Sequence, residues 1–452
     1  MSDHIDRTLA RLHERLHGRL TTDGDERYAR AVNIWPKPMG GLPRAVAHCR
    51  SPDDVQHAIR AARDCQLPLS VRGGGHDWAG RALCEGLVID LSGMRGVIIG
   101  PDAVAAISGG ARAMDITAQA DSLGLAPVSG SVGAVGVAGL TLGGGYGPLI
   151  GRFGLALDNL IAAEVVLADG RIVLAKDDSE QDLFWALRGG GGNFGVVTTM
   201  WQRLHPVPSV RSGLLVYPFA EAKGVLQRCM DLVVSAPDEL EVQTGFFIGP
   251  DGVPVVLVVP TWSGAEEQGE AWVKPYLRLG TLLAGSTEAM SYGSRLAAFD
   301  PFLANGLPTF MDASWLPAFD NEAIGLAIEA AGRAVGPGCA IITHEFKGAA
   351  SRVSEAATAF GLRRPHVLLE VLTSCPDRSE RPEQQRYQAW TLATRKAFAA
   401  KALPGAYPNF LAADDRQRAE QSYGRNAQRL IEVKRRYDPD NVFSSAIPLP
   451  TG

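Results

Sequence analysis

Three clusters of glycine are the residues of this chain whose type and spacing could do chemistry. They are Arg72-Gly-Gly-Gly-His76, Gly143-Gly-Gly145 and Gly189–Gly192, in a chain with 51 glycines among 452 residues. Consecutive glycines let a backbone approach an anion closely and turn several N–H groups toward it. Tight turns in a β-rich domain are the alternative interpretation of any one cluster. Together the three clusters predict a site for a phosphate-bearing cofactor.

Two familiar nucleotide signatures do not fit these clusters. The first cluster lacks the GxGxxG spacing with an acidic residue about 20 positions further on that a nicotinamide-binding Rossmann site has. No lysine follows any cluster, as a Walker loop requires. A nicotinamide-dependent dehydrogenase and a P-loop NTPase are therefore both disfavoured.

Two side chains are candidates for covalent and acid–base chemistry. His76 ends the first glycine cluster, and an imidazole beside an anion site is a place where a cofactor can be attached covalently. Glu370 is the one acid in the apolar run 367–372, a position from which a carboxylate could take a proton from a substrate. The alternative is that Glu370 faces solvent on an edge strand. His344 and Glu345, on the preceding expected strand, are rival candidates for this role. As neighbours in a strand, they point to opposite faces of the sheet.

The elements around these residues predict an α+β fold. Ser51 before Pro52, with acids following, is typical of a helix start. Asp169-Gly170 between two apolar runs predicts a hairpin of strands 161–167 and 171–175. Further helices are expected within 5–30 and over 110–123, 220–235, 264–279, 321–334, 383–400 and 416–435, and further strands over 213–217, 242–248, 253–260, 340–346 and 367–372.

Composition excludes several classes of protein. The length suits two or three structural units. The formal charge of −5 offers no basic field for nucleic acid. Apolar runs are too short to cross a membrane, and residues 1–30 carry no secretory signal, so we expect a cytoplasmic protein. Six dispersed cysteines form no CxxC pair, so we expect neither a disulfide framework nor a bound metal.

The motifs resemble those of a known family. Arg72–His76, the segment Gly130–Gly147, Gly189–Val197 and Tyr437-Asp-Pro-Asp-Asn-Val-Phe443 are similar to those of the FAD-linked oxidases of the vanillyl-alcohol oxidase / p-cresol methylhydroxylase superfamily, in the berberine-bridge-enzyme-like branch and its bacterial members. The resemblance implies a two-part FAD-binding domain of the p-cresol methylhydroxylase type. A substrate domain of antiparallel sheet covered by helices would be inserted in it. The implied units are an N-terminal helical segment 1–30, the first FAD-binding part 31–208, the substrate-binding domain 209–405 and a returning C-terminal segment 406–452.

The resemblance also implies roles for individual residues. The backbone of Arg72–His76 would bind the FAD pyrophosphate, and His76 would bond covalently to the 8α-methyl carbon of the flavin. Glu370 falls roughly where relatives carry a catalytic Glu, Gln or Asn, and Tyr407 could orient or deprotonate a substrate hydroxyl. The turn at Asp438–Asn441 is expected to be structural. The implied cofactor-binding residues are Arg72, Gly73, Gly74, Gly75, His76, Val132, Gly136, Gly139, Thr141, Gly144, Gly145, Val196, Val197, Tyr407 and Asn409.

Two positions depart from or refine the family pattern. Many relatives attach the flavin a second time through a cysteine, and here that position is Val132. We therefore expect one covalent link, through His76 only. Val135 stands where oxygen-using members often have valine. This favours an oxidase in which hydride passes from substrate to flavin N5 and O₂ is reduced to H₂O₂.

The sequence leaves three alternatives to this function open. They are a dehydrogenase that uses another acceptor, a flavin-oxygenating tailoring enzyme, and a non-enzymatic FAD binder. The substrate is expected to be a small organic molecule oxidised at a C–OH or C–N centre, and sugar, alkaloid and polyketide all remain open. Trp78, Phe310, Trp315 and Phe319 are candidates for an aromatic wall or for core residues.

Overall fold

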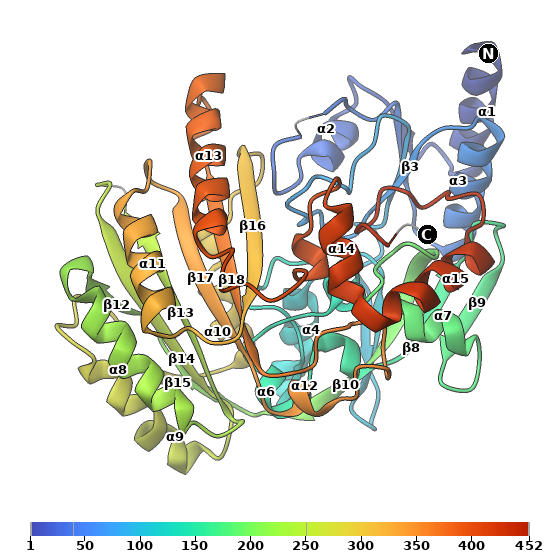
Figure 1. Cartoon of the computed structure of the whole chain (residues 1–452). Coiled ribbons are helices and arrows are strands. Elements are labelled where there is room, and N and C mark those ends of the chain that lie inside the picture. The colour runs from blue at the N-terminus through green and yellow to red at the C-terminus, as the bar shows by residue number, and fades with distance from the viewer. Residues whose placement is uncertain (1, 39, 250, 451–452) are drawn as a thin grey trace.

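The structure is a computed structural model that describes residues 2–38, 40–249 and 251–450. Residues 1 and 451–452, the outermost of the expected terminal segments, lie outside this part. Within it, strands form sheets of four, six and eight strands. Figure 1 shows the eight-stranded sheet in the left half and both smaller sheets, with both chain ends, in the right half. The expected α+β class is confirmed.

The four-stranded sheet has the order β1-β2-β4-β3 and carries the first glycine cluster at the end of β3. β2, β3 and β4 are parallel, while β1 is antiparallel to β2. The predicted helix start is confirmed, because the Ser51 side chain accepts a hydrogen bond from the Asp54 N–H and Pro52 begins the helix. The elements are α1 Ser2–Arg15, β1 Leu20–Thr21, α2 Glu26–Val32, β2 Ala45–His48, α3 Pro52–Asp64, β3 Leu69–Arg72 and β4 Leu87–Asp90.

The six-stranded sheet is antiparallel in all its pairs and lies beside the second and third glycine clusters. The hairpin predicted at Asp169-Gly170 is confirmed, with Val166 paired to Ile172. The elements are β5 Val97–Ile99, β6 Val104–Ser108, α4 Ala113–Ala120, β7 Leu125–Pro127, α5 Val137–Gly143, α6 Ile150–Phe153, β8 Leu160–Val166, β9 Ile172–Lys176, α7 Gln181–Leu187 and β10 Val196–Pro206.

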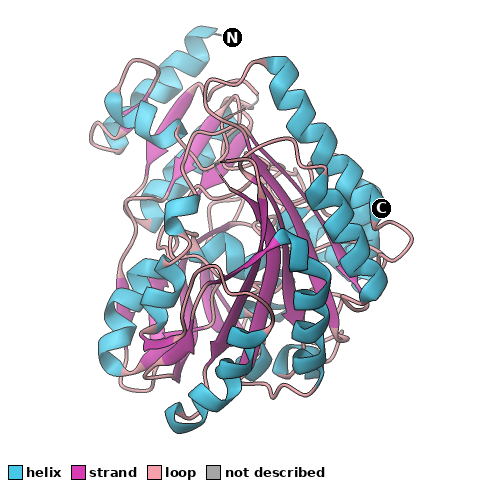
Figure 2. Cartoon of the chain, turned by 90° about the vertical axis from the view of Figure 1, so that its left-hand side faces the viewer, coloured by secondary structure: helices cyan, strands magenta, loops and turns pink. Residues whose placement is uncertain are grey.

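The eight-stranded sheet is also antiparallel, with the order β15-β11-β14-β13-β17-β18-β16 and β12 paired to β14. Helices cover one face, and the other face looks toward the glycine clusters (Figures 1 and 2). The elements are β11 Val210–Ser212, β12 Leu215–Pro218, α8 Ala222–Val234, β13 Leu240–Ile248, β14 Pro254–Trp262, α9 Glu266–Val273, β15 Glu288–Met290, α10 Tyr292–Ala297, β16 Thr309–Leu316, α11 Asn321–Gly332, β17 Cys339–Phe346, α12 Ala349–Arg352, β18 His366–Ser374 and α13 Arg381–Ala397.

The C-terminal residues return to the first half of the chain. Figure 1 shows α14 (Arg416–Tyr423) and α15 (Ala427–Tyr437), in red, against elements of the N-terminal half. After α15, the buried Asp438 accepts hydrogen bonds from the backbone N–H groups of Val442 and Phe443 at 2.9 Å each. This turn orders the backbone, in keeping with the structural role expected for it.

Three sequence expectations were wrong in detail. The single helix expected over 416–435 is broken at Gly424, whose φ of +48° ends α14. The N-terminal helical stretch 5–30 contains the short strand β1 between two helices. The strand β16 was not expected at all. Among the described residues, no helix is long and apolar enough to span a bilayer.

Candidate active site

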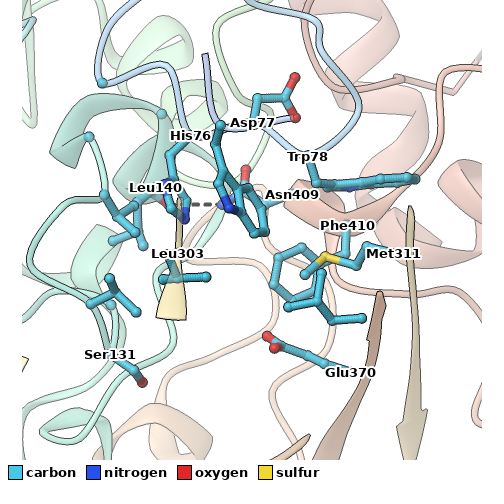
Figure 3. Close-up of a pocket in the computed structure, with 18 of the residues that line it drawn as sticks. His76, Asp77, Trp78, Ser131, Leu140, Leu303, Met311, Glu370, Asn409 and Phe410 are labelled. Carbon is cyan, nitrogen blue, oxygen red and sulfur yellow. Dashed lines mark hydrogen bonds between the residues drawn. The ribbon is translucent and has the colours of Figure 1, made fainter. Parts of the chain in front are cut away.

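One cavity of about 910 Å³ lies between the glycine clusters and the eight-stranded sheet. Figure 3 shows His76 on one side of it and the Glu370 carboxylate projecting into it from another. Of the residues expected to hold a cofactor, those at its wall are Gly73, Gly74, Gly75, His76, Val132, Gly136, Gly139, Val196, Val197, Tyr407 and Asn409.

Arg72 supports the first glycine loop from behind. Its guanidinium is buried, does not line the cavity, and pairs with the Asp90 carboxylate at 2.8 Å. Asp90 also accepts hydrogen bonds from Ser92 and contacts His48 Nδ1 at 2.9 Å. Burial opposes the charge of Asp90, but His48 and Arg72 hold the pKa of that carboxyl below its usual range. The ion pair therefore ties the loop to the ends of β3 and β4.

The first glycine cluster crosses the segment Gly130–Gly147 in direct backbone contact at Gly136. A Cβ added to Gly74 would lie 2.4 Å from the Gly136 Cα, and one added to Gly136 would lie 2.5 Å from the Gly74 nitrogen. Only glycine at both positions lets these two backbones touch. Gly139 and Gly192 differ, because a Cβ at either would meet nothing within 4 Å and both line the cavity. A side chain there would fill space that a ligand can use.

We expect Gly74→Ala to destabilise the fold by about 1–3 kcal/mol, because the added methyl forces two backbones apart. The fraction of protein that retains FAD should fall as well. The matched control is Gly325→Ala on α11, where a Cβ meets nothing within 4 Å and the free energy of unfolding should rise. Urea unfolding of both variants checks this, and equal stability of Gly74→Ala and wild type would contradict the crossing.

His76 is a half-buried, neutral imidazole at the cavity wall. Its ring stacks on Trp35 with 4.2 Å between centroids and an interplanar angle of 2°. Burial, together with the nearby charge of Arg112, lowers the pKa of His76 to about 4. Its nitrogen lone pair is thus available at neutral pH, and the stacking fixes the plane of the ring. This is the state that bond formation to an electrophilic carbon needs.

Thr141, Gly144 and Gly145 lie behind the cavity wall. A Cβ at Gly144, whose φ is +148°, would lie 2.6 Å from the Tyr407 ring. The Gly145 N–H donates to the Tyr407 hydroxyl at 2.8 Å. These glycines therefore place Tyr407, and Thr141 is fully buried in helix α5. Of the cofactor-binding residues expected in this segment, Val132, Gly136 and Gly139 reach the wall.

Tyr407 is held as a hydrogen-bond acceptor at the cavity wall. Its oxygen accepts from Gly145 and from the Asn409 side-chain amide, each at 2.8 Å, and Asn409 also donates to the Leu140 carbonyl at 3.1 Å. Burial raises the pKa of Tyr407 to about 12. At neutral pH this residue keeps its proton, which suits orientation of a substrate better than proton abstraction.

Glu370 lies on the cavity face of β18, which is an interior strand of its sheet. Its side chain is almost buried, so the edge-strand alternative is wrong. His344 on the adjacent strand places Nε2 3.2 Å from the Glu370 carboxylate. Burial opposes a charge on His344, but the Glu370 carboxylate holds the pKa of His344 above its usual value. Gln243 completes the row, 3.5 Å from His344.

Glu345 points to the opposite face of the sheet, as strand alternation requires. It does not line the cavity, and its electrostatic neighbours include Cys229 and Tyr276 in the core under the helices. Burial raises the pKa of Glu345 to about 7. Glu345 therefore has no path to a ligand in the cavity, and of the two strand acids Glu370 is the one that faces it.

A chain of buried hydrogen bonds joins His366, Tyr146 and Trp315 beside the cavity. His366 Nδ1 lies 2.7 Å from the Arg364 carbonyl, which only accepts, so Nδ1 carries the proton. His366 Nε2 then accepts from the Tyr146 hydroxyl at 2.7 Å, and Tyr146 accepts from the Trp315 indole at 3.1 Å. Burial lowers the pKa of His366 to about 3. The neutral ring is a requirement of this packing.

We expect His366 to make the fold less stable in acid. An unfolded histidine has a pKa of about 6.5, so the unfolded chain binds a proton that the folded chain refuses. The contribution of neutral His366 to the free energy of unfolding is complete above pH ~6.5. It decreases by about 1.4 kcal/mol per pH unit as the pH falls toward 3. Urea midpoints from pH 7 to 4 should fall less steeply for His366→Gln than for wild type. Parallel slopes would contradict this assignment.

Several residues of the site carried no signal in the sequence. Trp35, which stacks on His76, is 41 positions away in the chain, and its contact depends on the loop that follows α2. Gln243 is one polar residue in a long strand. Of the four aromatic candidates, Trp78 lines the cavity, whereas Trp315 is fully buried, and Phe310 and Phe319 pack in or against the core under the helices.

The wall residues fit an FAD. The backbone at Gly139 and Gly192 is open to the cavity and can offer N–H donors to phosphates. The mostly apolar wall suits the rings of a cofactor, and His76 is neutral. Gly73–Gly75, Gly136, Gly139 and Gly192 would hold the phosphates, and FAD would supply a two-electron acceptor. Val196 and Val197 lie at the wall near the third cluster.

Known proteins with a similar sequence are FAD-linked oxidoreductases. The family described as FAD binding domain matches residues 43–176, and the family described as berberine and berberine like matches residues 406–450. An FAD-linked oxidoreductase of Dictyostelium discoideum is 28% identical over 96% of this chain and 94% of its own. The FAD-linked oxidoreductase OXR1 of Pyricularia oryzae is 30% identical over 88% of this chain and 82% of its own.

A solved structure with a similar fold is 6-hydroxy-D-nicotine oxidase from Arthrobacter nicotinovorans. It has a TM-score of 0.84 and 26% identity, and the match covers 95% of this chain and 97% of that one. The fold, the two family matches and the relatives agree. The chain is an FAD-dependent oxidoreductase and belongs to the berberine-bridge-enzyme-like branch of the vanillyl-alcohol oxidase / p-cresol methylhydroxylase superfamily.

Proposed function

We propose that this protein is an oxidase that dehydrogenates a C–OH or C–N centre of a small organic substrate, with hydride transfer to FAD and reduction of O₂ to H₂O₂. The observation that carries the proposal is that His76, the open backbone at Gly139 and Gly192, and the Glu370 carboxylate line the same cavity. The relatives' oxidase names and Val135 at the cavity wall favour oxygen as the acceptor.

In this proposal Glu370 takes the proton from the substrate O–H or N–H. His344, at 3.2 Å, fixes the orientation of the carboxylate and balances its charge inside a buried wall. Tyr407 orients the substrate through its retained proton. His76 holds the cofactor through a covalent bond to the flavin 8α-methyl carbon. Val132 stands at the wall where a second attachment would need cysteine, so we propose that His76 is the sole link.

The test is to add a panel of aromatic alcohols, amines and sugars to the purified yellow protein. Loss of visible flavin absorbance without oxygen, followed by peroxide release with oxygen, is the expected result. Bleaching without peroxide on re-aeration would show a dehydrogenase instead. No bleaching by any member of the alcohol and amine panel would count against the proposed reaction.

A further inference from the structure

The polar groups on the sheet side of the cavity form one short row. Gln243, His344 and Glu370 stand on three adjacent strands, β13, β17 and β18, and are linked by contacts of 3.5 and 3.2 Å. The carbonyl oxygen of the Gln243 side chain and His344 Nδ1 are buried and have no hydrogen-bond partner among the described residues. Buried polar atoms left in this state call for a ligand or water to pair with them.

The remaining cavity face of the sheet is almost wholly apolar. Strand alternation turns aliphatic side chains of β12, β14, β17 and β18 into the cavity on both sides of the polar row. Two other polar residues of the sheet stand at the wall and are already paired: Ser374 lies 3.4 Å from Thr309, and the Thr244 hydroxyl lies 2.6 Å from that of Thr343. The aliphatic wall residues from these strands are Val216, Val255, Leu257, Val259, Ala340, Ile342 and Leu372.

Among the described residues that line the cavity, no cation is left uncommitted for an anionic ligand. Arg81 lines it, but its guanidinium bonds both oxygens of Asp77 and the carbonyls of Asn409 and Leu411. His344 is paired with the Glu370 carboxylate. A carboxylate or phosphate on the substrate would therefore be desolvated without compensation.

Further aromatic and aliphatic side chains line the cavity at the segment 299–303 and on the nearby strands β13 and β16. Phe302 follows α10, is 59% exposed and lies 6.3 Å from the Phe247 ring and 6.5 Å from the Phe299 ring. Leu303 and Met311 stand in the same wall (Figure 3). An exposed phenylalanine beside two others gives the cavity an apolar surface suited to flat rings.

We infer that the cavity selects an uncharged, flat, largely apolar molecule that carries one hydroxyl or amine donor beside the carbon to be oxidised. The donor binds the Gln243–His344–Glu370 row, and the rings pack on the aliphatic face and the phenylalanines. This inference rests on the proposed function for the position of the reacting carbon. A sugar, with hydroxyls on every edge, would leave several of them buried without hydrogen-bond partners, which weakens its binding.

Binding can be measured on the holoprotein without turnover. The probes are 2-naphthol, its methyl ether 2-methoxynaphthalene, the anion 2-naphthoate and the sugar cellobiose, each followed by isothermal titration under nitrogen. We expect 2-naphthol to bind about tenfold more tightly than the methyl ether, because only the naphthol donates to the polar row. We expect 2-naphthoate and cellobiose to bind more weakly than both.

A variant separates the polar row from the shape of the cavity. Gln243→Leu removes the unpaired carbonyl acceptor of the row but leaves the Glu370 carboxylate, so affinity for 2-naphthol should fall several-fold toward that of the methyl ether, while affinity for the methyl ether stays the same. The matched control is Gln227→Leu on helix α8, on the far side of the sheet, which should change neither affinity.

Three results would overturn the inference: tighter binding of cellobiose than of 2-naphthol, tighter binding of 2-naphthoate than of 2-naphthol, or an equal loss of both naphthyl probes in Gln243→Leu. Failure of the proposed reaction would give a different set of binding and bleaching results. In that case the naphthyl compounds bind in the expected order, but no alcohol or amine of the substrate panel bleaches the flavin.

Discussion

Replacing Glu370 by glutamine should slow flavin reduction by substrate about 10²–10⁴-fold, the usual contribution of a positioned base. Glutamine keeps the size and hydrogen-bonding capacity of the side chain but cannot accept the substrate proton at neutral pH. The content of bound FAD should stay the same, because Glu370 stands on the sheet side of the cavity and away from the glycine cradles. Anaerobic stopped-flow spectroscopy of the flavin band measures the rate directly.

Glu345→Gln is the matched control for this prediction. The same chemical change is made on the neighbouring strand, but on the face that packs against the helices. Its rate of flavin reduction should stay within about threefold of wild type. A large loss in Glu345→Gln with little loss in Glu370→Gln would mean that the base had been assigned to the wrong face of the sheet.

Removing the Asp90 carboxylate should have the largest effect on stability. Asp90→Ala leaves the buried Arg72 guanidinium without its ion-pair partner, which typically costs about 3–5 kcal/mol. Because Arg72 directly precedes the first glycine cluster, the loop should also lose its position and the protein its FAD. The free energy of unfolding in urea and the ratio of flavin to protein absorbance test both effects.

Two further variants keep this prediction testable if Asp90→Ala fails to fold. Asp90→Asn retains one acceptor oxygen and should give an intermediate loss of stability. Ser92→Ala removes only one hydroxyl that donates to Asp90 at 2.9 Å and should cost about 1 kcal/mol. Equal stability of Asp90→Asn and wild type would show that the charge of Asp90 does not support the loop.

Local patterns in the sequence predicted local structure well. The Ser51-Pro52 start and the Asp169-Gly170 hairpin depend on residues within a few positions of each other, and both were found. Strand alternation also predicted that His344 and Glu345 would face opposite sides. It could not tell which side held the cavity, since that depends on the packing of the sheet against a segment more than 200 residues earlier.

The features that were missed depend on distant partners. Strand β16 carries Asp312 within an apolar run, and Arg395 and Arg418 from two later helices pair with it. These partners cannot be recognised in the sequence, and an unpaired acid in an apolar run argues against a buried strand. The helix expected over 416–435 runs through Gly424, but the positive φ of this residue divides α14 from α15.

The glycine clusters predicted that other groups approach the backbone closely, but not which group lies beside each glycine. Gly136 meets the backbone of Gly74, Gly144 meets the Tyr407 ring, and Gly139 opens onto the cavity. The three lie within nine residues and look alike in the sequence. Only the folded arrangement separates a glycine that would touch a ligand from one that lets two parts of the chain touch each other.

The central claim is that one FAD occupies this cavity and is bonded to His76 alone. The most direct measurement is mass spectrometry of peptides from the acid-denatured, protease-digested holoprotein, beside a His76→Ala control. We predict that the peptide containing His76 carries the mass of one FAD and that the denatured control releases all its flavin. Flavin attached to any other peptide, flavin retained by denatured His76→Ala, or full release of flavin from the denatured wild type would contradict the claim.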